Sequence, residues 1–411
     1  MTARQDTLVL DRAPNAADFP ASARFAMRLL ERLDHGGLEL AFPDGQRALF
    51  GRGAPVSDLR LANWNMFPAT MRGGDVGFAE SFIAGDWASS DLPRLLAFLL
   101  RNRAAAERMI YGSFWGTLVA RLRHLLNRNT KAQARKNIHA HYDLGNDFYS
   151  LWLDPGMTYS SALLEDVRDP HAVLSPAAMA AGQDAKYARV LDELELAPGS
   201  RVLEIGCGWG GLAELAAQRG HALTGLTLST EQLAWARERL ARQGLEADLR
   251  LQDYRDETGV YDGVASIEMF EAVGEEYWPS YFGTVARSLR SGGRACIQSI
   301  VIDDALFARY RKGTDFIQQY IFPGGMLPSP AAFKAQAEAA GLRVERSLAF
   351  GRAYARTLAT WRASFMAQLP AVRELGFDER FVRIWDYYLA CCEAAFAEGS
   401  TDVVQYTLVR Q

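Results

Sequence analysis

The feature that most constrains this chain is a glycine-rich turn at residues 206–210, with the sequence GCGWG. The turn follows an apolar segment and opens a helical pattern. Glycine is required in such a turn because a Cβ would clash where the backbone closes around a ligand. The backbone N–H groups and the helix N-terminus favour a negatively charged group there. The turn therefore predicts an α/β domain that binds a nucleotide-like cofactor.

The sequence around this turn alternates strands with helices at the spacing of βαβ units. Strands are predicted at residues 201–205, 222–228, 248–252, 263–267 and 295–302, and helices at 210–219, 230–243 and 275–289. Further on we predict a helix at 330–340, a strand at 344–350, helical segments over 355–397 and a last strand at 403–409. Alternating units of this length imply a parallel, doubly wound sheet.

Three details choose between NAD, FAD and S-adenosylmethionine, the cofactors that a glycine turn can serve. The glycines are spaced GxGxG, with Glu204 two residues before the first, and not in the GxGxxG form of dinucleotide enzymes. The second strand ends without the acidic residue that commonly binds a ribose in those enzymes. The third strand ends at Asp253, whose carboxylate could accept a hydrogen bond from an adenine amino group. These details favour S-adenosylmethionine over a purely structural turn.

Length and composition narrow the remaining classes of protein. A chain of 411 residues has room for two or three domains. Its net charge of −4 argues against a general nucleic-acid-binding surface. The four cysteines lack CxxC and zinc-finger spacing, which indicates free thiols in a reducing compartment. The longest strongly apolar stretch, residues 95–100, is too short to cross a bilayer, and the N-terminus lacks a secretory signal pattern.

The first third of the chain divides into three predicted regions. Residues 1–20 are expected to be a poorly ordered leader. Residues 21–111 are expected to form an α+β domain, with a helix at 22–33 capped by Ser22, strands at 37–42 and 46–50, and short helices over 75–102. Residues 112–136 are basic and amphipathic, which is typical of an interdomain helix with a solvated face. A helix that binds anionic lipid headgroups is the alternative.

Four further blocks stand out in the second part of the chain. They are residues 137–149 (NIHAHYDLGNDFY), 153–161 (LDPGMTYSS), 269–271 (MFE) and 321–325 (IFPGG). With the glycine turn, their order and spacing over residues 137–411 closely resemble the cyclopropane-fatty-acyl-phospholipid synthases. Residues 74–80 and 85–87 more loosely resemble the lipid-contacting N-terminal domain of the bacterial members. The resemblance implies a class I methyltransferase domain, Rossmann-like and doubly wound, over 137–411, with an acyl-tunnel insertion near 303–328.

The resemblance implies methyl transfer from S-adenosylmethionine to the cis double bond of an unsaturated phospholipid acyl chain, with closure to a cyclopropane ring. The carbocation formed on the way must be kept from water, which favours aromatic walls. The cofactor-binding residues expected are Tyr142, Tyr159, Ser160, Glu204, Gly206, Gly208, Gly210, Thr227, Gln232, Gln252 and Asp253. The tunnel residues expected are Phe270, Tyr310, Phe316, Tyr320 and Phe322, although any single aromatic is more often core packing.

In the family, a bicarbonate ion serves as the base. Carried over by motif, its ligands include Glu271, Ile300 and Tyr354, but Ser161 stands where the family has Cys and Gln298 where it has His. Either these two side chains still hold the anion, or the cation loses its proton elsewhere and gives a methyl-branched or methylene-bearing product. These departures leave both bicarbonate binding and the product open.

The resemblance also implies a cytoplasmic protein at the inner face of the membrane, unsaturated phospholipids as partners, and a homodimer. No metal site is expected, because no cysteine or carboxylate cluster completes one around His139 and His141. The alternatives are a catalytically inactive lipid- or cofactor-binding homologue and a nucleotide-dependent oxidoreductase. An assay of methyl transfer from labelled S-adenosylmethionine to unsaturated phospholipid separates an active enzyme from the inactive homologue. Measurement of NAD binding tests the oxidoreductase alternative.

Overall fold

The computed structural model of the protein describes residues 19–103 and 144–411, which form two compact units. The first unit contains residues up to 103 together with 379–394, and the second contains 144–378 and 395–411. Three predictions fall outside the described residues. They concern most of the leader, the basic segment 112–136, and the side chains of His139, His141 and Tyr142.

The first unit is built on a four-stranded sheet of order β2-β1-β3-β4. Its strands are β1 (Gly36–Ala41), β2 (Arg47–Arg52), β3 (Val56–Leu61) and β4 (Trp87–Ala88), and its first helices are α1 (Ala21–Leu30), α2 (Met66–Ile83) and α3 (Leu92–Arg101). The predicted hairpin of β1 and β2 is confirmed, whereas β3, which pairs parallel to β1, was not predicted. Helix α1 starts at Ala21 with Pro20 before it, so the prediction that Ser22 caps this helix is wrong.

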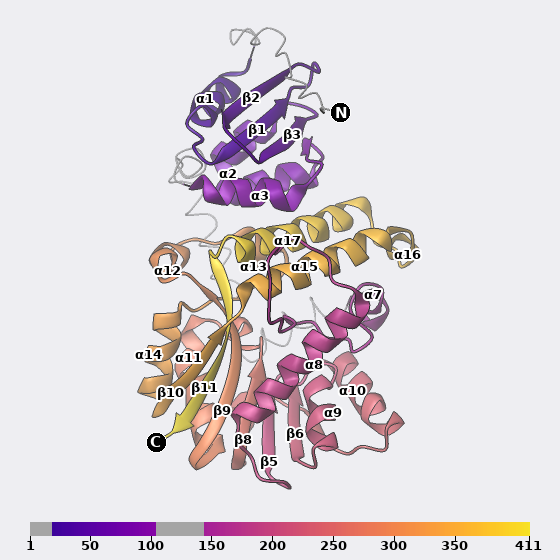
Figure 1. The fold of residues 1–411 in the computed structure, drawn as a ribbon, viewed down its shortest axis with the longest axis vertical. Coiled ribbons are helices and arrows are strands. Elements are labelled where there is room, and N and C mark those ends of the chain that lie inside the picture. The colour runs from indigo at the N-terminus through magenta and orange to yellow at the C-terminus, as the bar shows by residue number, and fades with distance from the viewer. Residues whose placement is uncertain (1–18, 104–143) are drawn as a thin grey trace, which may run out of the picture. The chain divides into compact units, whose positions relative to one another are not determined.

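The second unit contains a seven-stranded sheet of order β10-β11-β9-β8-β5-β6-β7 (Figure 1). Its strands are β5 (Arg201–Ile205), β6 (Ala222–Thr227), β7 (Asp248–Leu251), β8 (Tyr261–Ile267), β9 (Leu289–Ile302), β10 (Leu342–Ala349) and β11 (Thr401–Arg410). The strands β5 to β9 pair in parallel, while β11 runs antiparallel to both β9 and β10. The predicted doubly wound sheet is confirmed.

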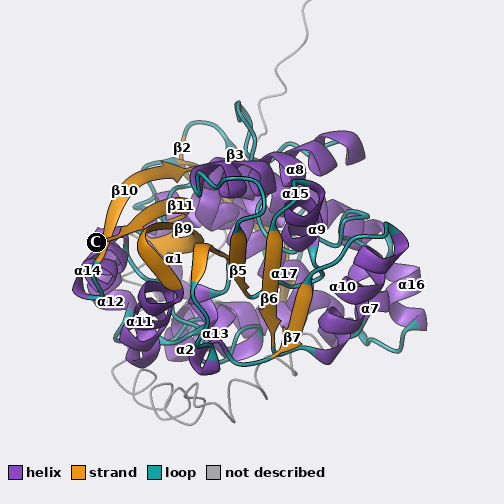
Figure 2. Ribbon diagram, turned by 90° about the horizontal axis from the view of Figure 1, so that it is seen from below, coloured by secondary structure: helices purple, strands orange, loops and turns teal. Residues whose placement is uncertain are grey.

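Helices cover both faces of this sheet, and Figure 2 shows α8 and α9 on one side of the strands and α11 on the other. The first face carries α8 (Pro176–Glu193), α9 (Gly211–Gln218) and α10 (Thr230–Arg242), and the second carries α11 (Trp278–Ser288) and α14 (Pro330–Ala339). The remaining helices are α7 (Asn146–Ser150), α12 (Asp304–Tyr310), α13 (Phe316–Tyr320), α15 (Gly351–Ala367), α16 (Leu369–Glu374) and α17 (Glu379–Ala397), with short 3-10 turns η2 (Tyr254–Asp256), η3 (Phe270–Ala272) and η4 (Glu275–Tyr277). None of the helices in the described ranges is both long and apolar enough to cross a membrane.

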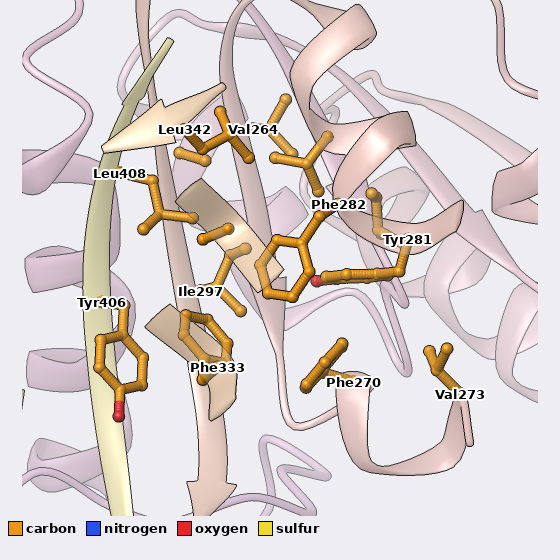
Figure 3. Close-up of a cluster of buried hydrophobic side chains, with 14 of the residues drawn as sticks. Val264, Phe270, Val273, Tyr281, Phe282, Ile297, Phe333, Leu342, Tyr406 and Leu408 are labelled. Atoms are coloured by element: carbon orange, nitrogen blue, oxygen red, sulfur yellow. The ribbon is translucent and has the colours of Figure 1, made fainter. Parts of the chain in front are cut away.

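Aromatic side chains pack together within the core between the sheet and α11 and α14 (Figure 3). The ring of Phe333 stacks on Tyr406 at 4.1 Å and meets Phe282 edge-on at 5.0 Å. Phe270 is fully buried in the same cluster. Fully burying one such side chain stabilises the fold by about 1.5–3 kcal/mol, so this cluster holds the carboxyl end of β8 and the η3 turn in a fixed place.

Candidate active site

The principal pocket lies at the carboxyl ends of β5, β6, β7 and β8, beside the point where the strand order reverses. Open α/β sheets bind ligands at this position. Residues from the ends of all four strands line it, together with side chains from residues 157–160 and from α8. Among the predicted cofactor residues, the lining contains Tyr159, Ser160, Glu204, Gly206, Gly208, Thr227, Gln232, Gln252 and Asp253.

The glycine turn shapes the floor of this pocket. Gly206 and Gly208 have φ values of +87° and +49°, which favour glycine. A Cβ on Gly206 would lie 2.8 Å from the Met269 side chain, whereas a Cβ on Gly208 would meet nothing within 4 Å and would project into open space. Gly210 does not line the pocket; it is the N-cap residue of α9 and lies against Ala236 of α10.

Glu204 places a buried carboxyl group in the pocket, where a nearby cationic group would favour its ionised form. Its carboxylate is buried, and no donor among the described residues reaches its Oε2 atom. Burial raises the pKa of Glu204 to about 8, and Arg239 and Lys186 oppose this rise. An unpaired buried carboxylate oxygen beside an open glycine turn fits the amino group and sulfonium of S-adenosylmethionine, which would supply the methyl group when bound.

Hydrogen bonds within the protein hold the polar side chains that line the pocket at the ends of β6 and β7. Thr227 donates to Gln232 Oε1 at 3.2 Å, and Gln252 donates to Glu257 at 2.9 Å. The Asp253 carboxylate accepts two bonds from the Arg255 guanidinium, at 2.6 and 2.8 Å. Its proposed bond to an adenine amino group therefore remains a prediction.

A second set of residues converges on a side chain that sequence reasoning missed, Glu268 at the end of β8. Its Oε1 accepts from the Ser161 backbone N–H at 2.8 Å and from Gln298 Nε2 at 2.7 Å. Its Oε2 accepts from the Tyr354 hydroxyl at 2.6 Å. Burial raises the pKa of Glu268, while the nearby Lys186 ammonium and these three donors oppose the rise. The site thus holds a carboxylate among three donors.

Three of the five residues expected to bind bicarbonate hold this carboxylate instead, and the other two, Ile300 and Glu271, bond to each other. Ser161, Gln298 and Tyr354 all donate to Glu268, and the Ser161 hydroxyl itself donates to the Ala162 carbonyl at 3.0 Å. A free bicarbonate ion therefore does not fit this set of donors. The acidic residue directly before the Met-Phe-Glu block, at the carboxyl end of a buried strand, was the sequence signal for this role.

Glu271 lies next to this site and differs from Glu268 in its charge state. Its carboxylate accepts from the Ile300 backbone N–H, and Oε2 has no partner among the described residues. Burial, and then the neighbouring Glu268, raises the pKa of Glu271 to about 8. Two carboxylates in one buried site cannot both ionise easily, so Glu271 carries the proton near neutral pH.

Lys186 on α8 joins the cofactor side of the pocket to the carboxylate side. It is fully buried, donates to the Ser160 hydroxyl, and donates to Gln183 Oε1 at 2.7 Å. Burial lowers its pKa to about 7, against the attraction of Glu268, Asp154 and Glu204.

Among the predicted tunnel residues, Phe270 lies in the core and Phe316 stacks on Tyr320 at 5.1 Å. The Tyr310 hydroxyl accepts from Gln318 Nε2 and from the Leu327 N–H, both at 3.2 Å. None of the five lines the principal pocket. Their tunnel role, including that of Phe322, remains a prediction. No group of three or more His, Cys, Asp or Glu within the described ranges is arranged to hold a metal.

The strand order of the second unit, with β11 antiparallel, is the sheet of the class I methyltransferases, whose cofactor is S-adenosylmethionine. A family model described as mycolic acid cyclopropane synthetase matches residues 129–406. The chain belongs to this cyclopropane synthase family, whose enzymes methylate or cyclopropanate lipid acyl chains.

Two relatives extend the likeness across nearly the whole chain. The tuberculostearic acid methyltransferase UfaA1 of Mycobacterium tuberculosis is 39% identical over 417 residues, covering 98% of this chain and 96% of that protein. The cyclopropane-fatty-acyl-phospholipid synthase of Escherichia coli K12 is 35% identical over 364 residues, covering 87% and 89%. The crystal structure of mycolic acid cyclopropane synthase CmaA1 with SAH and CTAB is 32% identical with a TM-score of 0.61, and covers 67% of this chain and 98% of that one. The match to UfaA1 therefore includes the N-terminal unit.

Proposed function

We propose that this protein transfers a methyl group from S-adenosylmethionine to the cis double bond of a phospholipid acyl chain and releases an open-chain product, either methyl-branched or methylene-bearing. The observation that supports this product is the Glu268 carboxylate, which accepts hydrogen bonds from three of the residues expected to hold bicarbonate, Ser161, Gln298 and Tyr354. The relative UfaA1, which matches 98% of the chain, is named as a methyltransferase.

The chemistry explains why the position of the base decides the product. The alkene π electrons form a bond to the methyl carbon while the methyl–sulfur bond breaks, which leaves a carbocation on the acyl chain. Ring closure needs a base that takes a proton from the new methyl group before the cation rearranges. Glu268 is held by its three donors and can accept a proton only where its own oxygens lie. A cation that keeps this proton can undergo a hydride shift from the methyl-bearing carbon to its neighbour. Loss of a methyl proton to the carboxylate then gives a methylene group, and loss of a proton from an adjacent chain carbon gives a methyl-branched alkene.

The protein contributes charge and exclusion of water to this step. The Glu268 carboxylate is a fixed negative charge that stabilises a cation in a site of low dielectric. Neutral Glu271 adds no second charge, and the aromatic rings of Tyr159, Trp361 and Tyr354 lie together, with centroids 5.3 and 6.0 Å from that of Trp361. Such ring faces are suited to a desolvated cation.

The test is proton NMR of the lipid product formed from S-adenosylmethionine and dioleoyl phospholipid vesicles. We expect vinylic or methyl-branch signals and no upfield cyclopropane methylene signals. Cyclopropane as the major product would contradict the proposal and support the ring closure that the name of the Escherichia coli relative describes. Cofactor binding without label transfer would support the inactive class.

Replacing Glu268 tests its role as the base. Glu268→Gln should lower kcat by about 100-fold or more, in the range that general acid–base groups contribute. The control is Glu275→Gln on the η4 turn, whose glutamate pairs with Arg311 outside the pocket and should leave kcat unchanged. Turnover of Glu268→Gln at the normal rate would exclude Glu268 as the base.

Access to a phospholipid acyl chain requires contact between the protein and a membrane surface. We propose that it meets the lipid at the cytoplasmic face of the membrane, because its substrate is an acyl chain that must leave a bilayer to reach a buried pocket. Sedimentation of the protein with anionic vesicles would test this.

A further inference from the structure

A line of polar side chains connects the outer side of α8 to Glu268. The Arg189 guanidinium donates to Gln405 Oε1 at 3.0 Å, Gln405 Nε2 donates to Gln298 Oε1 at 2.9 Å, and Gln298 Nε2 donates to Glu268 Oε1 at 2.7 Å. The four residues come from α8, β11, β9 and the end of β8.

The two glutamines lie directly opposite each other in the antiparallel pairing of β11 with β9. Both side chains are fully buried, with 0% exposure. A buried amide without partners costs about 1–3 kcal/mol, so each amide is held by the neighbours on its two sides.

The direction of the line follows from the chemistry at its two ends. A guanidinium can only donate hydrogen bonds, so the Gln405 atom that faces Arg189 must be its oxygen. The Gln405 amide nitrogen must then face Gln298, which in turn must present its oxygen to Gln405 and its nitrogen to Glu268. An ionised carboxylate can only accept, which suits the same direction. The amide orientations are therefore determined by Arg189 and Glu268 together.

We propose that Arg189 and Gln405 are positioning residues that lock the Gln298 amide as a donor, and so keep Glu268 a carboxylate ready to accept a proton at Oε2. The proposal rests on the function proposed above. Oε1 already receives two N–H donors, from Gln298 and Ser161, neither of which can reverse. The hydroxyl on Oε2 can turn and accept, so only this oxygen can take the proton.

The charged and titratable groups around Glu268 fit this assignment. Lys186 faces it from α8, Glu271 from η3 and Tyr354 from α15. At the other end, Glu193 holds Arg189 through an ion pair of 3.1 Å and itself accepts from Thr407 at 2.6 Å. The guanidinium is thus fixed before it meets Gln405.

Gln405→Glu tests the proposal with little change of shape. The new carboxylate accepts from Arg189 but offers Gln298 an acceptor, so the Gln298 amide turns and presents its carbonyl to Glu268. Because burial already raises the pKa of Glu268, this repulsion raises it further, and the acid limb of the kcat–pH profile moves to higher pH. We expect a shift of about one to two pH units, which corresponds to one hydrogen bond to a charged group.

Three further variants separate positioning from structural damage. Arg189→Met should shift the acid limb in the same direction. Arg189→Lys, which keeps a donor, should bring the acid limb most of the way back to its position in the unmodified protein. Thr284→Val is the matched control, because the Thr284 hydroxyl is equally buried but donates to the Ser280 carbonyl within α11, outside the line and away from Arg189 and Glu193. It should leave the profile in place.

The readout is label transfer from S-adenosylmethionine to oleoyl phospholipid between pH 5 and 9. An unshifted profile for Gln405→Glu, or an equal shift for Thr284→Val, would overturn the positioning role. If Glu268→Gln is inactive while Gln405→Glu keeps the normal pH profile, the positioning role of Arg189 and Gln405 is contradicted, and the role of Glu268 as the base is supported. If Glu268→Gln is fully active, the proposed base itself fails.

Discussion

Glu268 holds a backbone conformation that residues with a Cβ rarely adopt, with φ at +49°. A left-handed conformation costs a residue other than glycine about 1–2 kcal/mol. Strain of this kind persists where interactions with the surrounding structure compensate for it, and such positions cluster at functional sites. At Glu268 the compensating interactions are the three hydrogen bonds that its carboxylate accepts.

At the scale of this residue we predict a difference between two variants that both lack the carboxylate. Glu268→Gly should be more stable than Glu268→Ala by about 1 kcal/mol, because only glycine adopts this φ without strain. Urea unfolding of the two proteins measures the difference, and both leave the same donors unpaired. Equal stabilities would show that the strain inferred from φ is absent.

Sequence reasoning found the partners of Glu268 but not Glu268 itself. Ser161, Gln298 and Tyr354 were singled out by motif, and the structure brings them together. Their common partner was missed because motif transfer identifies the residues that bind an ion in the family. It does not test whether a side chain of this protein lies where the ion would bind.

At the scale of elements, the glycine turn fixes how α9 and α10 pack. Gly210 is the N-cap residue of α9, with φ at +83°, and a Cβ there would lie 2.9 Å from the Ala236 Cβ of α10. The third glycine therefore serves the contact between two helices, whereas the first two serve the pocket.

Gly210→Ala should destabilise the protein by more than Gly220→Ala. Gly220 has a similar φ of +76°, but a Cβ there meets nothing within 4 Å. Gly220→Ala should cost about 1–2 kcal/mol from φ alone, and Gly210→Ala should add the clash with Ala236. In urea unfolding, the double variant Gly210→Ala/Ala236→Gly should lose less than the sum of the single changes. Equal losses for the two glycines would contradict the packing role.

Most elements of the second unit followed from periodicity and turn residues. The strand over 201–205 was predicted to the residue, and β6, β7, β8, β10 and β11 within two residues at each end. Helix α8 was missed, although it carries both Lys186 and Arg189. The helix predicted to start at 275 begins at Trp278, because a 3-10 turn precedes it.

At the scale of the whole molecule, the first unit contains a helix from the far end of the chain. Residues 379–394 of α17 cluster with residues up to 103. Arg383 donates to the Phe82 carbonyl at 2.7 Å, and its guanidinium lies over the Phe82 ring at 5.2 Å. The centroids of the Phe82 and Tyr387 rings are 5.6 Å apart. The Phe82 carbonyl also accepts from the Gly85 N–H at 2.9 Å, so Arg383 adds a second donor at the last turn of α2.

Arg383→Met should loosen the first unit by about 1–2 kcal/mol, because it removes one hydrogen bond and a cation–π contact but keeps the apolar stem. Hydrogen exchange should become faster in α2 and β4 and stay unchanged in β5 and β6. Arg380→Met, at an exposed position of the same helix, is the control and should leave α2 unchanged. Unaltered exchange in α2 for Arg383→Met would show that α17 does not support this unit.

The sequence by itself determined the sheet, the cofactor turn and the family, because periodicity, glycine spacing and motif blocks are local properties of the chain. Only the tertiary structure decided how the reacting site is charged. Glu268, Gln298, Tyr354 and Gln405 are separated by 30 to more than 100 positions, and a hydrogen bond between two of them forms only when β8, β9, α15 and β11 have packed. Which residue takes the proton depends on that packing, because donors and acceptors act over about 3 Å in space and not along the sequence.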